Sequence, residues 1–513
     1  MDIESLYELY LRHPEVTTDS RRCPQGSMFF ALRGESFDGN LFAAKALEGG
    51  SAIAVVDNPE VVPSGDNRYV LVPDVLKALQ ALATRHRQSF KGPVLQVTGT
   101  NGKTTTKELL AAVLSERYKV LYTQGNLNNH IGVPLTLLRL RPTDEVAIIE
   151  TGANHPGEIA LLTKIVQPDY GLITNVGRAH LEGFGSFEGV KRTKGELYDY
   201  IQQKASAHVF INSSNSDLMS MLSERKMSSE RCIAYGHEGD ALGQIICRGA
   251  VAACEPMLKV RWQGTTGEMH AVQTQLIGDY NVDNVLAAVA VGLHFGVAEE
   301  AIDHALEHYR PSLGRSEYRK TAANELIIDA YNANLTSMMA ALKNFKKIEG
   351  DKKMVILGDM KELGAESERA HEAVAREAMA EEGAGNGGQT AVHTTHGNHS
   401  EQGGEQSEQS EQDKQNDRSD QGNKSNHSEQ GSEQSEQSEQ DKQNDRSSRR
   451  AWFVGENFEK ALKGITAAQD IEIRCFKDAE AVKETIKKEK PTGWLILIKG
   501  SNSTKLHQLP ELL

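Results

Sequence analysis

The sequence predicts an α/β protein of three domains, with a long polar insertion in the last one. Three observations lead to this prediction. The 513 residues are enough for several domains of about 100–200 residues each. Short apolar runs alternate with helical patterns, as in parallel sheets covered by helices. Residues 393–450 contain no Ala, Val, Ile, Leu, Met, Phe, Trp, Tyr or Cys, so they cannot build a core.

Residues 1–90 are predicted to form a small α/β unit. The run SMFFALRG (27–34) resembles a strand that ends in glycine, and FAAKALEGG (42–50) resembles a helix closed by a glycine cap. SAIAVVD (51–57) and RYVLVPD (68–74) contain the β-branched and aromatic residues that favour strands.

Residues 91–313 are predicted to form a doubly wound parallel sheet, with βα units throughout. VLQVTG (94–99) reads as a strand, and the helical pattern of residues 103–118 follows it. EVAIIETG (145–152) and YGLITNVG (170–177) are further continuous apolar runs. Such runs are typical of parallel strands that are buried on both faces.

Residues 314–513 repeat the pattern and are predicted to form a second, smaller, Rossmann-like α/β domain. Helical patterns cover residues 336–348 and 367–382, between apolar runs. The expected strands are ELIIDAY (325–331), KMVILGDM (353–360), RAWFVGENF (450–458) and GWLILIKG (493–500).

A low-complexity insertion is predicted at residues 384–450, between a helix and a strand that are neighbours in this pattern. The segment EQSEQSEQDKQNDRS occurs twice, at 405–419 and at 433–447. A segment this polar cannot bury enough apolar surface to offset the entropy cost of ordering it. We therefore expect a disordered surface loop. Long loops cost little closure entropy, which lets the domain tolerate it. Recruitment of a partner is the alternative role.

Composition excludes several classes of function. The net charge is −14, and no Lys/Arg stripe with interleaved aromatic residues favours nucleic-acid binding. The five cysteines are scattered without a CxxC pair, so neither a zinc site nor a disulfide framework is indicated. The N-terminus lacks the pattern of a signal peptide, and no apolar run reaches the roughly 18 residues of a membrane span. We therefore expect a cytoplasmic protein without membrane insertion.

The segment VLQVTGTNGKTTT (94–106) carries the clearest chemical signal. A predicted strand runs into a glycine-rich turn, and a helix begins directly after it. Glycines let backbone amides approach phosphate oxygens, and the helix N-terminus favours negative charge. Lys103 is expected to reach the terminal phosphates, and the Thr104 hydroxyl is expected to bind Mg²⁺. The spacing is the short GxxGK[ST] form of the phosphate-binding loop.

Two further side chains follow strand ends on the same side of the predicted sheet. Glu150 ends the strand of IIETGANHPGEI, and its carboxylate suits a magnesium ion between ATP phosphates. An exposed strand-end glutamate is the alternative. His180 lies in ITNVGRAHLEGFGS, just after another strand. A lone histidine is more often structural than a ligand.

The TGTNGKTT form resembles the Mur ligase family and its relative, folylpolyglutamate synthase. The resemblance extends from about residue 17 to the C-terminus, interrupted only by the insertion. It implies ATP and two Mg²⁺ ions as cofactors, with His180 as a ligand of the second ion. It also implies that Lys194, in VKRTKGELYDY, is carbamylated and binds metal. The implied ATP-binding turn comprises Gly99, Thr100, Asn101, Gly102, Lys103, Thr104 and Thr105, and the implied metal ligands are Thr104, Glu150, His180 and Lys194.

The resemblance also implies binding residues in other segments. TQGNLNNHIGVPLTLL resembles the family's muramoyl-substrate loop, although asparagine-rich turns are also common as plain structure. GDYNVDNV resembles the start of the adenine-binding helix, with Tyr280 where many relatives have histidine. GRSEY resembles a segment that contacts ATP phosphate or ribose, and TDSRRC resembles the UDP-binding segment. The implied residues are Asn126, Asn128 and Asn129 for the sugar and peptide, Asn281 and Asn284 for adenine, Arg315 for ATP, and Ser20 and Arg21 for UDP.

The last domain resembles the family member that adds D-alanyl-D-alanine. IIDAYNANLTSMMAAL, VILGDMKELG and KGSNSTKL carry this resemblance. It implies an ATP contact at Asp329 and substrate contacts at Asn332 and Asn334. Ala330 and Leu335 depart from the commoner residues of the motif. The DNPR motif of the diaminopimelate-adding relative is missing from this domain.

The implied reaction is ATP-dependent formation of an amide bond through an acyl-phosphate. Its partners would be UDP-N-acetylmuramoyl-tripeptide and D-alanyl-D-alanine, with no nucleic acid, and the chain would act as a monomer in peptidoglycan synthesis. The alternatives are a relative that adds another amino acid, such as a folylpolyglutamate-type ligase, and a nucleotide-binding scaffold without catalysis. A P-loop motor or switch fits poorly, because it has no use for three α/β units and a sugar loop.

Overall fold

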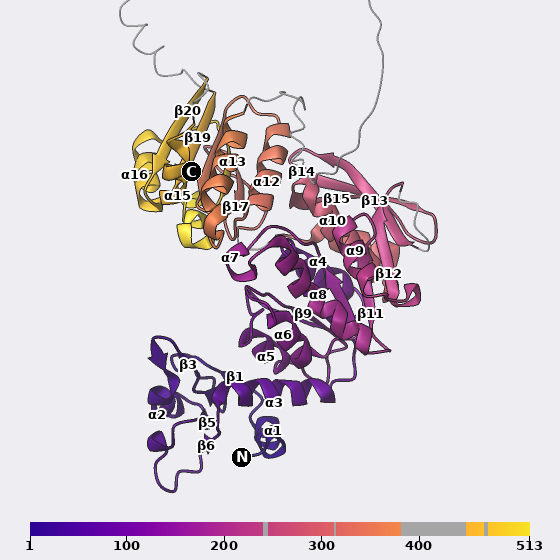
Figure 1. Cartoon of the computed structure of the whole chain (residues 1–513), viewed down its shortest axis with the longest axis vertical. Helices are drawn as coiled ribbons and strands as arrows, with labels where there is room; N and C mark the ends of the chain where they lie inside the picture. Colours follow the sequence, from indigo (N-terminus) through magenta and orange to yellow (C-terminus); the bar gives the residue numbers. More distant parts are fainter. Residues whose placement is uncertain (240–244, 312–313, 381–447, 466–469) are drawn as a thin grey trace, which may run out of the picture.

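The computed structural model describes residues 1–239, 245–311, 314–380, 448–465 and 470–513. It contains three large sheets, one after another in the sequence, and one small two-stranded sheet near the N-terminus. Figure 1 shows them stacked along the long axis of the molecule, with the N-terminal sheet at the bottom and the C-terminal sheet at the top. The predicted α/β class with three successive sheets is confirmed. Most of the predicted disordered insertion, residues 384–447, lies outside the described residues.

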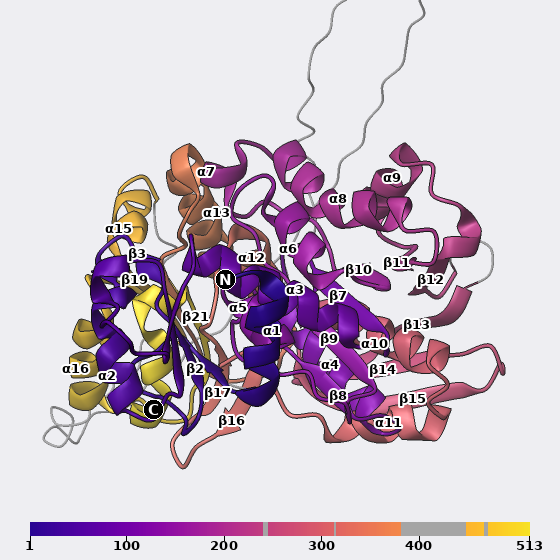
Figure 2. The same cartoon turned by 90° about the horizontal axis from the view of Figure 1, so that it is seen from below.

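The N-terminal sheet has four parallel strands in the order β1-β2-β5-β6, and helix α3 connects it to the central unit. Helix α3 packs on helix α1 and on strand β2, and also on helices α5 and α6 of the central unit (Figures 1 and 2). The elements are α1 (Ile3–Arg12), β1 (Val16–Thr17), β2 (Met28–Phe30), the hairpin of β3 (Arg33–Gly34) and β4 (Phe37–Asp38), α2 (Ala43–Glu48), β5 (Ile53–Val56), β6 (Tyr69–Leu71) and α3 (Val75–Ser89).

The central sheet has nine strands in the order β15-β14-β13-β12-β11-β10-β7-β9-β8. Its parallel part has strands β7 (Val94–Thr98), β8 (Val120–Tyr122), β9 (Val146–Glu150), β10 (Tyr170–Ile173), β11 (His208–Asn212) and β12 (Cys232–His237). The helices are α4 (Lys103–Ser115), α5 (Gly132–Leu137), α6 (Glu158–Val166), α7 (Leu181–Phe184), α8 (Phe187–Gln203), α9 (Ser216–Glu224), α10 (Val282–His294) and α11 (Glu299–His308).

The prediction of parallel βα units throughout residues 91–313 was wrong at one edge of this sheet. Strand β13 (Ile245–Cys254) pairs in parallel with β12, but β14 (Met257–Gln263) and β15 (Met269–Ile277) extend it in antiparallel fashion. Along β15, buried and less buried residues alternate for most of its length, as in a strand with one face on a core. This period-two pattern is the signal that distinguishes the antiparallel edge from the continuous apolar runs of the parallel strands.

The C-terminal sheet has six strands in the order β16-β17-β21-β18-β19-β20, all parallel except β16. Its strands are β16 (Glu317–Lys320), β17 (Glu325–Asp329), β18 (Lys353–Gly358), β19 (Arg449–Val454), β20 (Ile471–Phe476) and β21 (Leu495–Lys499). Its helices are α12 (Leu335–Lys347), the short 3-10 turn η5 (Gly364–Glu366), α13 (Ser367–Met379), α15 (Glu456–Leu462) and α16 (Ala479–Glu489).

The predicted end of the insertion at residue 450 was wrong, because strand β19 already begins at Arg449. Both arginines at its start have defined partners. Arg449 pairs with Asp470 at 3.0 Å, and Arg450 pairs with Glu472 at 2.8 Å. The Arg450 guanidinium also lies 4.5 Å from the centre of the Trp494 ring. Charge pairing and ring contact therefore let polar residues continue a strand that hydrophobicity alone does not detect.

Among the described residues, no helix has the length and apolar character needed to cross a lipid bilayer.

Candidate active site

The glycine-rich turn joins strand β7 to helix α4 and requires glycine at two positions. Gly99 has a φ of 144°, and a Cβ there would lie 2.0 Å from the Thr174 hydroxyl oxygen. Gly102 has a φ of 76°, and a Cβ there would lie 2.5 Å from Oδ1 of Asn284. The loop after β10 holds the turn, because the Thr100 N–H donates to the Asn175 carbonyl at 2.9 Å. The predicted strand, turn and helix are therefore present, in a tightly fixed form.

The Lys103 side chain folds back over this turn. Its Nζ donates to the carbonyl oxygens of Gly99 at 2.8 Å and Thr100 at 2.9 Å. Burial lowers the pKa of Lys103, the carboxylate of Glu150 acts in the opposite direction, and Arg315 adds to the lowering. The ammonium thus rests on neutral acceptors in a site where a phosphate would be a stronger partner.

A cavity of about 710 Å³ opens above the turn, between the central and C-terminal units. It lies beyond the carboxyl ends of β7, β9 and β10, where α/β sheets bind their ligands. Most of the predicted site residues line it together, namely Thr100, Asn101, Gly102, Lys103, Thr104, Thr105, Asn128, Asn129, Glu150, His180, Asn281, Asn284, Arg315, Asp329 and Asn332. The other predicted residues, which do not line it, are Ser20, Arg21, Gly99, Asn126, Lys194 and Asn334.

Glu150 ends strand β9 at the floor of the cavity and is only 1% exposed. Its Oε1 accepts a hydrogen bond from the Asn128 amide at 2.8 Å. Its Oε2 is buried and has no hydrogen-bond partner among the residues that the structure describes. Buried polar atoms normally have partners, so an orphaned carboxylate oxygen in a cavity that Thr104 also lines fits a hard cation such as Mg²⁺.

His180 lies at the start of helix α7, with a φ of 52°, and contacts the C-terminal unit. Its Nδ1 is hydrogen-bonded to the carboxylate of Glu362. Burial lowers the pKa of His180, Glu362 acts against this, and the positive charges of Lys103 and Lys194 lower it further. Sequence reasoning missed Glu362, although it stands in the quoted GDMKELG segment, because no pattern pointed to an acidic partner for this histidine.

Lys194 lies on helix α8 and is 3% exposed. It does not line the cavity, and its Nζ lies 5.6 Å from the centre of the Phe184 ring. Burial is the main cause that lowers the pKa of Lys194 to about 7, the charge of Lys103 adds to it, and Glu158 and Glu196 act against it. A substantial share of this amine is therefore neutral near pH 7.

Asn281 and Asn284 lie at the start of helix α10 and form hydrogen bonds within the protein. The Asn284 amide donates to Oδ1 of Asn281 at 2.8 Å, and the Asn281 amide donates to the Ile277 carbonyl at 2.8 Å. Oδ1 of Asn284 accepts from the Thr106 hydroxyl at 2.9 Å. Helix α10 is thereby tied to helix α4. Both side chains line the cavity, but these contacts are within the protein.

The C-terminal unit contributes the opposite wall. Lys499, which sequence reasoning did not select, is 1% exposed and pairs with the Asp329 carboxylate. Asn334 lies outside the cavity lining, caps helix α12, and donates from its amide to Oδ1 of Asn101 at 2.7 Å. Asn332 accepts from the Ala333 N–H at 2.9 Å. Asn334 therefore joins the two units across the phosphate-binding turn.

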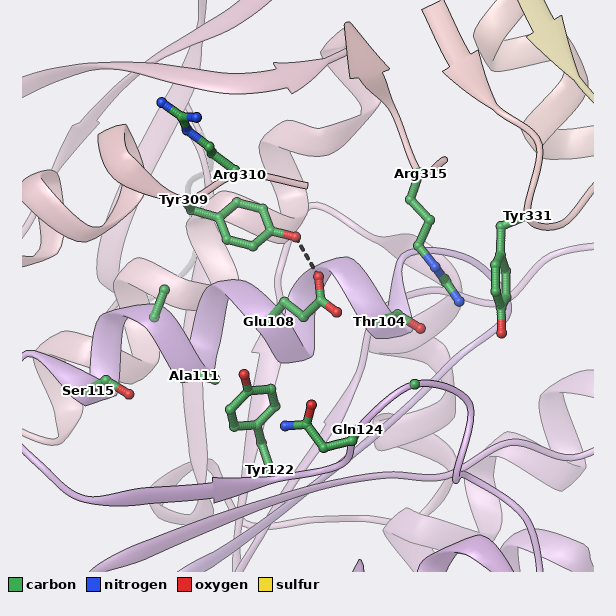
Figure 3. Close-up of a pocket in the computed structure, with 12 residues that line it drawn as sticks. Thr104, Glu108, Ala111, Ser115, Tyr122, Gln124, Tyr309, Arg310, Arg315 and Tyr331 are labelled. Atoms are coloured by element: carbon green, nitrogen blue, oxygen red, sulfur yellow. Dashed lines mark hydrogen bonds between the residues drawn. The ribbon is translucent and has the colours of Figure 1, made fainter. Parts of the chain in front are cut away.

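A second cavity, of about 480 Å³, adjoins the first along the outer face of helix α4 (Figure 3). The two cavities share Thr104, Arg315 and Tyr331. The Arg315 guanidinium stacks on the Tyr331 ring, 3.5 Å from its centre. Figure 3 also shows the hydrogen bond from the Tyr309 hydroxyl to Glu108, which is 2.7 Å long. Arg315 is thus held between the two cavities by an aromatic contact.

The predicted UDP-binding residues lie in the N-terminal unit, apart from this cavity. Arg21 has a side chain that is 81% exposed and pairs with Asp19 at 2.8 Å. Ser20 belongs to the same loop, between β1 and β2. Asn126 is exposed in the segment before helix α5. Their assignment to UDP and sugar remains a prediction.

Comparison with known proteins agrees with this arrangement. Family models described as Mur ligase family, catalytic domain, as Mur ligase middle domain and as Mur ligase, glutamate ligase domain match residues 14–87, 97–292 and 314–402. The UDP-N-acetylmuramoyl-tripeptide–D-alanyl-D-alanine ligase of Escherichia coli K12 is 38% identical over 71% of this chain and 78% of its own. The chain belongs to the Mur ligase family.

Other members of the Mur ligase family extend the comparison. The ligase of the same name from Bacillus subtilis 168 is 36% identical, over 69% of this chain and 75% of its own. The crystal structure of MurF from Acinetobacter baumannii is 28% identical and has a TM-score of 0.75, covering 99% of this chain and 97% of its own. MurF from Thermotoga maritima, solved in complex with ADP, shares the fold with a TM-score of 0.72.

Proposed function

We infer that this Mur ligase joins D-alanyl-D-alanine to UDP-N-acetylmuramoyl-tripeptide at the expense of ATP, forming the pentapeptide precursor of peptidoglycan. The inference rests on identities of 36–38% to ligases that are named for this reaction. The YNAN and GDMKELG segments, which line or border the cavity through Asn332 and Glu362, support the same member of the family.

The residues of the chain account for the chemistry as follows. When ATP enters, the Lys103 ammonium exchanges its loop carbonyls for the terminal phosphate. The tripeptide carboxylate attacks the γ-phosphorus, the bond from that phosphorus to ADP breaks, and an acyl-phosphate forms. The amine of D-alanyl-D-alanine attacks the acyl carbon, loses a proton, and inorganic phosphate leaves. Closure of the C-terminal unit over the cavity would exclude the water that hydrolyses the intermediate.

Two Mg²⁺ ions are proposed, held by Thr104, Glu150, His180 and a carbamate on Lys194. When bound, such ions neutralise charge on the phosphoryl group in transfer. The orphaned Glu150 Oε2 supports a cation at the floor of the cavity. A pKa of about 7 supports the carbamate, because only a neutral amine attacks carbon dioxide. The nitrogen–carbon bond forms and a proton is released, which turns the lysine into an anionic ligand.

The remaining assignments are proposals of the same kind. Residues 1–90 would bind UDP through Ser20 and Arg21, residues 91–313 would bind ATP, and residues 314–513 would present D-alanyl-D-alanine. Asn126, Asn128 and Asn129 would contact the muramoyl peptide, and Asn281, Asn284, Arg315 and Asp329 would contact the nucleotide. We further propose that the chain works as a cytoplasmic monomer.

One assay tests the proposed function. ADP release is measured from the purified protein with UDP-N-acetylmuramoyl-tripeptide, with D-alanyl-D-alanine supplied or withheld. We expect sustained ADP release only when both substrates are present. ADP release that instead requires a different amino acid would assign the chain to another Mur ligase reaction, and no release with any amine would favour a non-catalytic scaffold.

A further inference from the structure

Lys107 is a buried charge that the proposed chemistry does not use. It lies on helix α4, one turn after Lys103, and is 0% exposed. Removing an ammonium group from water costs several kcal/mol, so its retention calls for an explanation. Its Nζ donates to the Thr123 carbonyl oxygen at 2.7 Å, and the nearer carboxylate oxygen of Glu108 is 3.5 Å away. The hydrogen bond is thus made to a neutral group at the end of strand β8.

Thr123 is directly connected to Glu150. The Thr123 hydroxyl oxygen accepts a hydrogen bond from the Glu150 backbone N–H at 3.0 Å. Its own N–H donates to the Ile148 carbonyl of strand β9 at 3.1 Å. Lys107 therefore fixes, through one residue, the backbone position from which the Glu150 carboxylate projects.

The segment that follows Thr123 returns to the same carboxylate. Five residues later, the Asn128 amide donates to Oε1 of Glu150 at 2.8 Å, and the Asn128 carbonyl accepts from the Gly152 N–H at 2.8 Å. Residues 124–127 between these anchors are mostly exposed. The two ends of this surface loop, Thr123 and Asn128, thus both form hydrogen bonds with Glu150. Lys107 forms a hydrogen bond with the end that follows strand β8.

The charges near Lys107 also indicate that it positions other groups. Burial lowers the pKa of Lys107, and the carboxylates of Glu150 and Glu108 act against this lowering. The ammonium is therefore close enough to Glu150 for the two charges to interact. A cation bound by Glu150 would be repelled by this charge, so Lys107 cannot serve merely to attract the metal. We therefore attribute the retention of Lys107 to the way it positions Thr123 and, through Thr123, Glu150.

We propose that Lys107 is a positioning residue, which anchors Thr123 so that Thr123 and Asn128 hold the Glu150 carboxylate with Oε2 free for a metal ion. This inference rests on the proposed metal site. Partners that orient a metal ligand typically contribute roughly ten- to a hundredfold to metal affinity. Lys107→Met, which keeps the length and removes the ammonium, should therefore weaken metal binding, even though it removes a repulsive charge.

The test is binding of Mn²⁺, a spectroscopic substitute for Mg²⁺, to the full-length protein with a non-hydrolysable ATP analogue, followed by electron paramagnetic resonance. We expect Lys107→Met to raise the dissociation constant by roughly tenfold. The matched control is Lys353→Met, since Lys353 is another buried lysine whose Nζ donates to a backbone carbonyl, that of Lys346 at 3.1 Å. That variant should bind Mn²⁺ as the wild type does.

A double-mutant cycle tests the route through the loop. If Lys107 and Asn128 act on the same carboxylate through one loop, Lys107→Met and Asn128→Ala should be non-additive, with a combined effect well below the product of the two. If Lys107→Met does not fold, Thr123→Val removes the middle link with little change of shape and should also weaken Mn²⁺ binding.

The outcomes separate this inference from the proposed function. Unchanged or tighter Mn²⁺ binding by folded Lys107→Met, or full additivity with Asn128→Ala, would overturn the positioning role. Failure of the wild-type protein to bind Mn²⁺ with the nucleotide would instead overturn the proposed metal site itself.

Discussion

At the scale of single residues, the most informative atom is the orphaned Oε2 of Glu150. A buried carboxylate oxygen without a partner is unfavourable unless a ligand satisfies it. Glu150→Gln keeps an acceptor for the Asn128 amide, so the fold should persist, but it removes the negative charge. We expect ligase activity to fall by a factor on the order of a hundred or more, because charge neutralisation in phosphoryl transfer is lost. Initial rates of ADP release, with circular dichroism as the folding control, test this expectation.

His270 gives a second prediction at this scale, on stability. The ring stacks on Trp262 with centroids 4.1 Å apart, and its nitrogens contact Asp303 at 2.6 Å and Glu299 at 3.1 Å. Burial of the ring acts to lower the pKa of His270, but the contacts with Asp303 and Glu299 together outweigh it, so the pKa is raised. Since the folded-state pKa lies above the unfolded value of about 6.5, the stabilisation is fully present below that value. It is lost as the pH rises through the folded-state pKa.

His270→Phe keeps the stacking and removes both charged contacts. We expect it to lower the free energy of unfolding more at pH 6 than at pH 9. Urea unfolding at the two pH values measures this difference. The exposed pair of His304 with Glu116, removed by His304→Gln, provides a surface control that should change stability little. A cost for His270→Phe that grows with pH would contradict the imidazolium assignment.

At the scale of elements, the glycine-rich turn depends on space as much as on backbone conformation. Gly102→Ala places a Cβ against Oδ1 of Asn284, which is itself held by Thr106. Gly65 offers a matched control, with a φ of 80° and nothing within 4 Å of the added atom. We expect Gly102→Ala to weaken binding of ATP by at least tenfold, whereas Gly65→Ala should leave it unchanged. Equilibrium binding of a fluorescent ATP analogue to both variants measures this difference, and Gly65→Ala controls for the general effect of an alanine at positive φ.

The elements also show what the sequence could and could not predict. Strands β7 and β9, and the turn of Gly99 to Lys103, follow from apolar runs and local glycine chemistry, so they were predicted with nearby bounds. The antiparallel edge of β14 and β15 was missed, because its alternating pattern was read as part of a repeated βα scheme. Contacts between distant segments, such as His180 with Glu362, leave no local pattern and could not be predicted.

At the scale of the whole molecule, the central and C-terminal units meet through Ile277, which packs in the C-terminal core, and through polar contacts near the larger cavity. His180 bonds Glu362, and Asn101 accepts from Asn334 at 2.7 Å. Glu362→Ala removes the first contact without touching either sheet. We expect the two units to separate more readily, seen as a larger radius of gyration by small-angle X-ray scattering and a higher KM for ATP. Identical scattering profiles for variant and wild type would argue that this contact does not hold the units together.

Hydrogen bonds from Arg449 to the carbonyls of Met379 and Ala380 join the segments that flank the polar insertion, which allows its contribution to be tested. The Arg449 guanidinium donates to the Ala380 carbonyl at 2.7 Å, so the end of helix α13 and the start of strand β19 lie side by side. Residues 384–446 can therefore be replaced by a short glycine-serine linker without stretching the chain. Since neither flank would move, we expect kcat and KM to stay within about twofold of the wild type and the melting temperature to change little.

A deletion that continues through residue 450 should behave differently. It removes Arg449 and Arg450, and with them the ion pairs to Asp470 and Glu472 and the contact with the Trp494 ring. We expect this longer deletion to lower the melting temperature clearly relative to the shorter one, because it also truncates the paired part of β19. The melting temperatures of both deletion variants, measured under the same conditions, test this expectation. A large loss of activity already in the shorter deletion would show that the insertion contributes directly to the reaction.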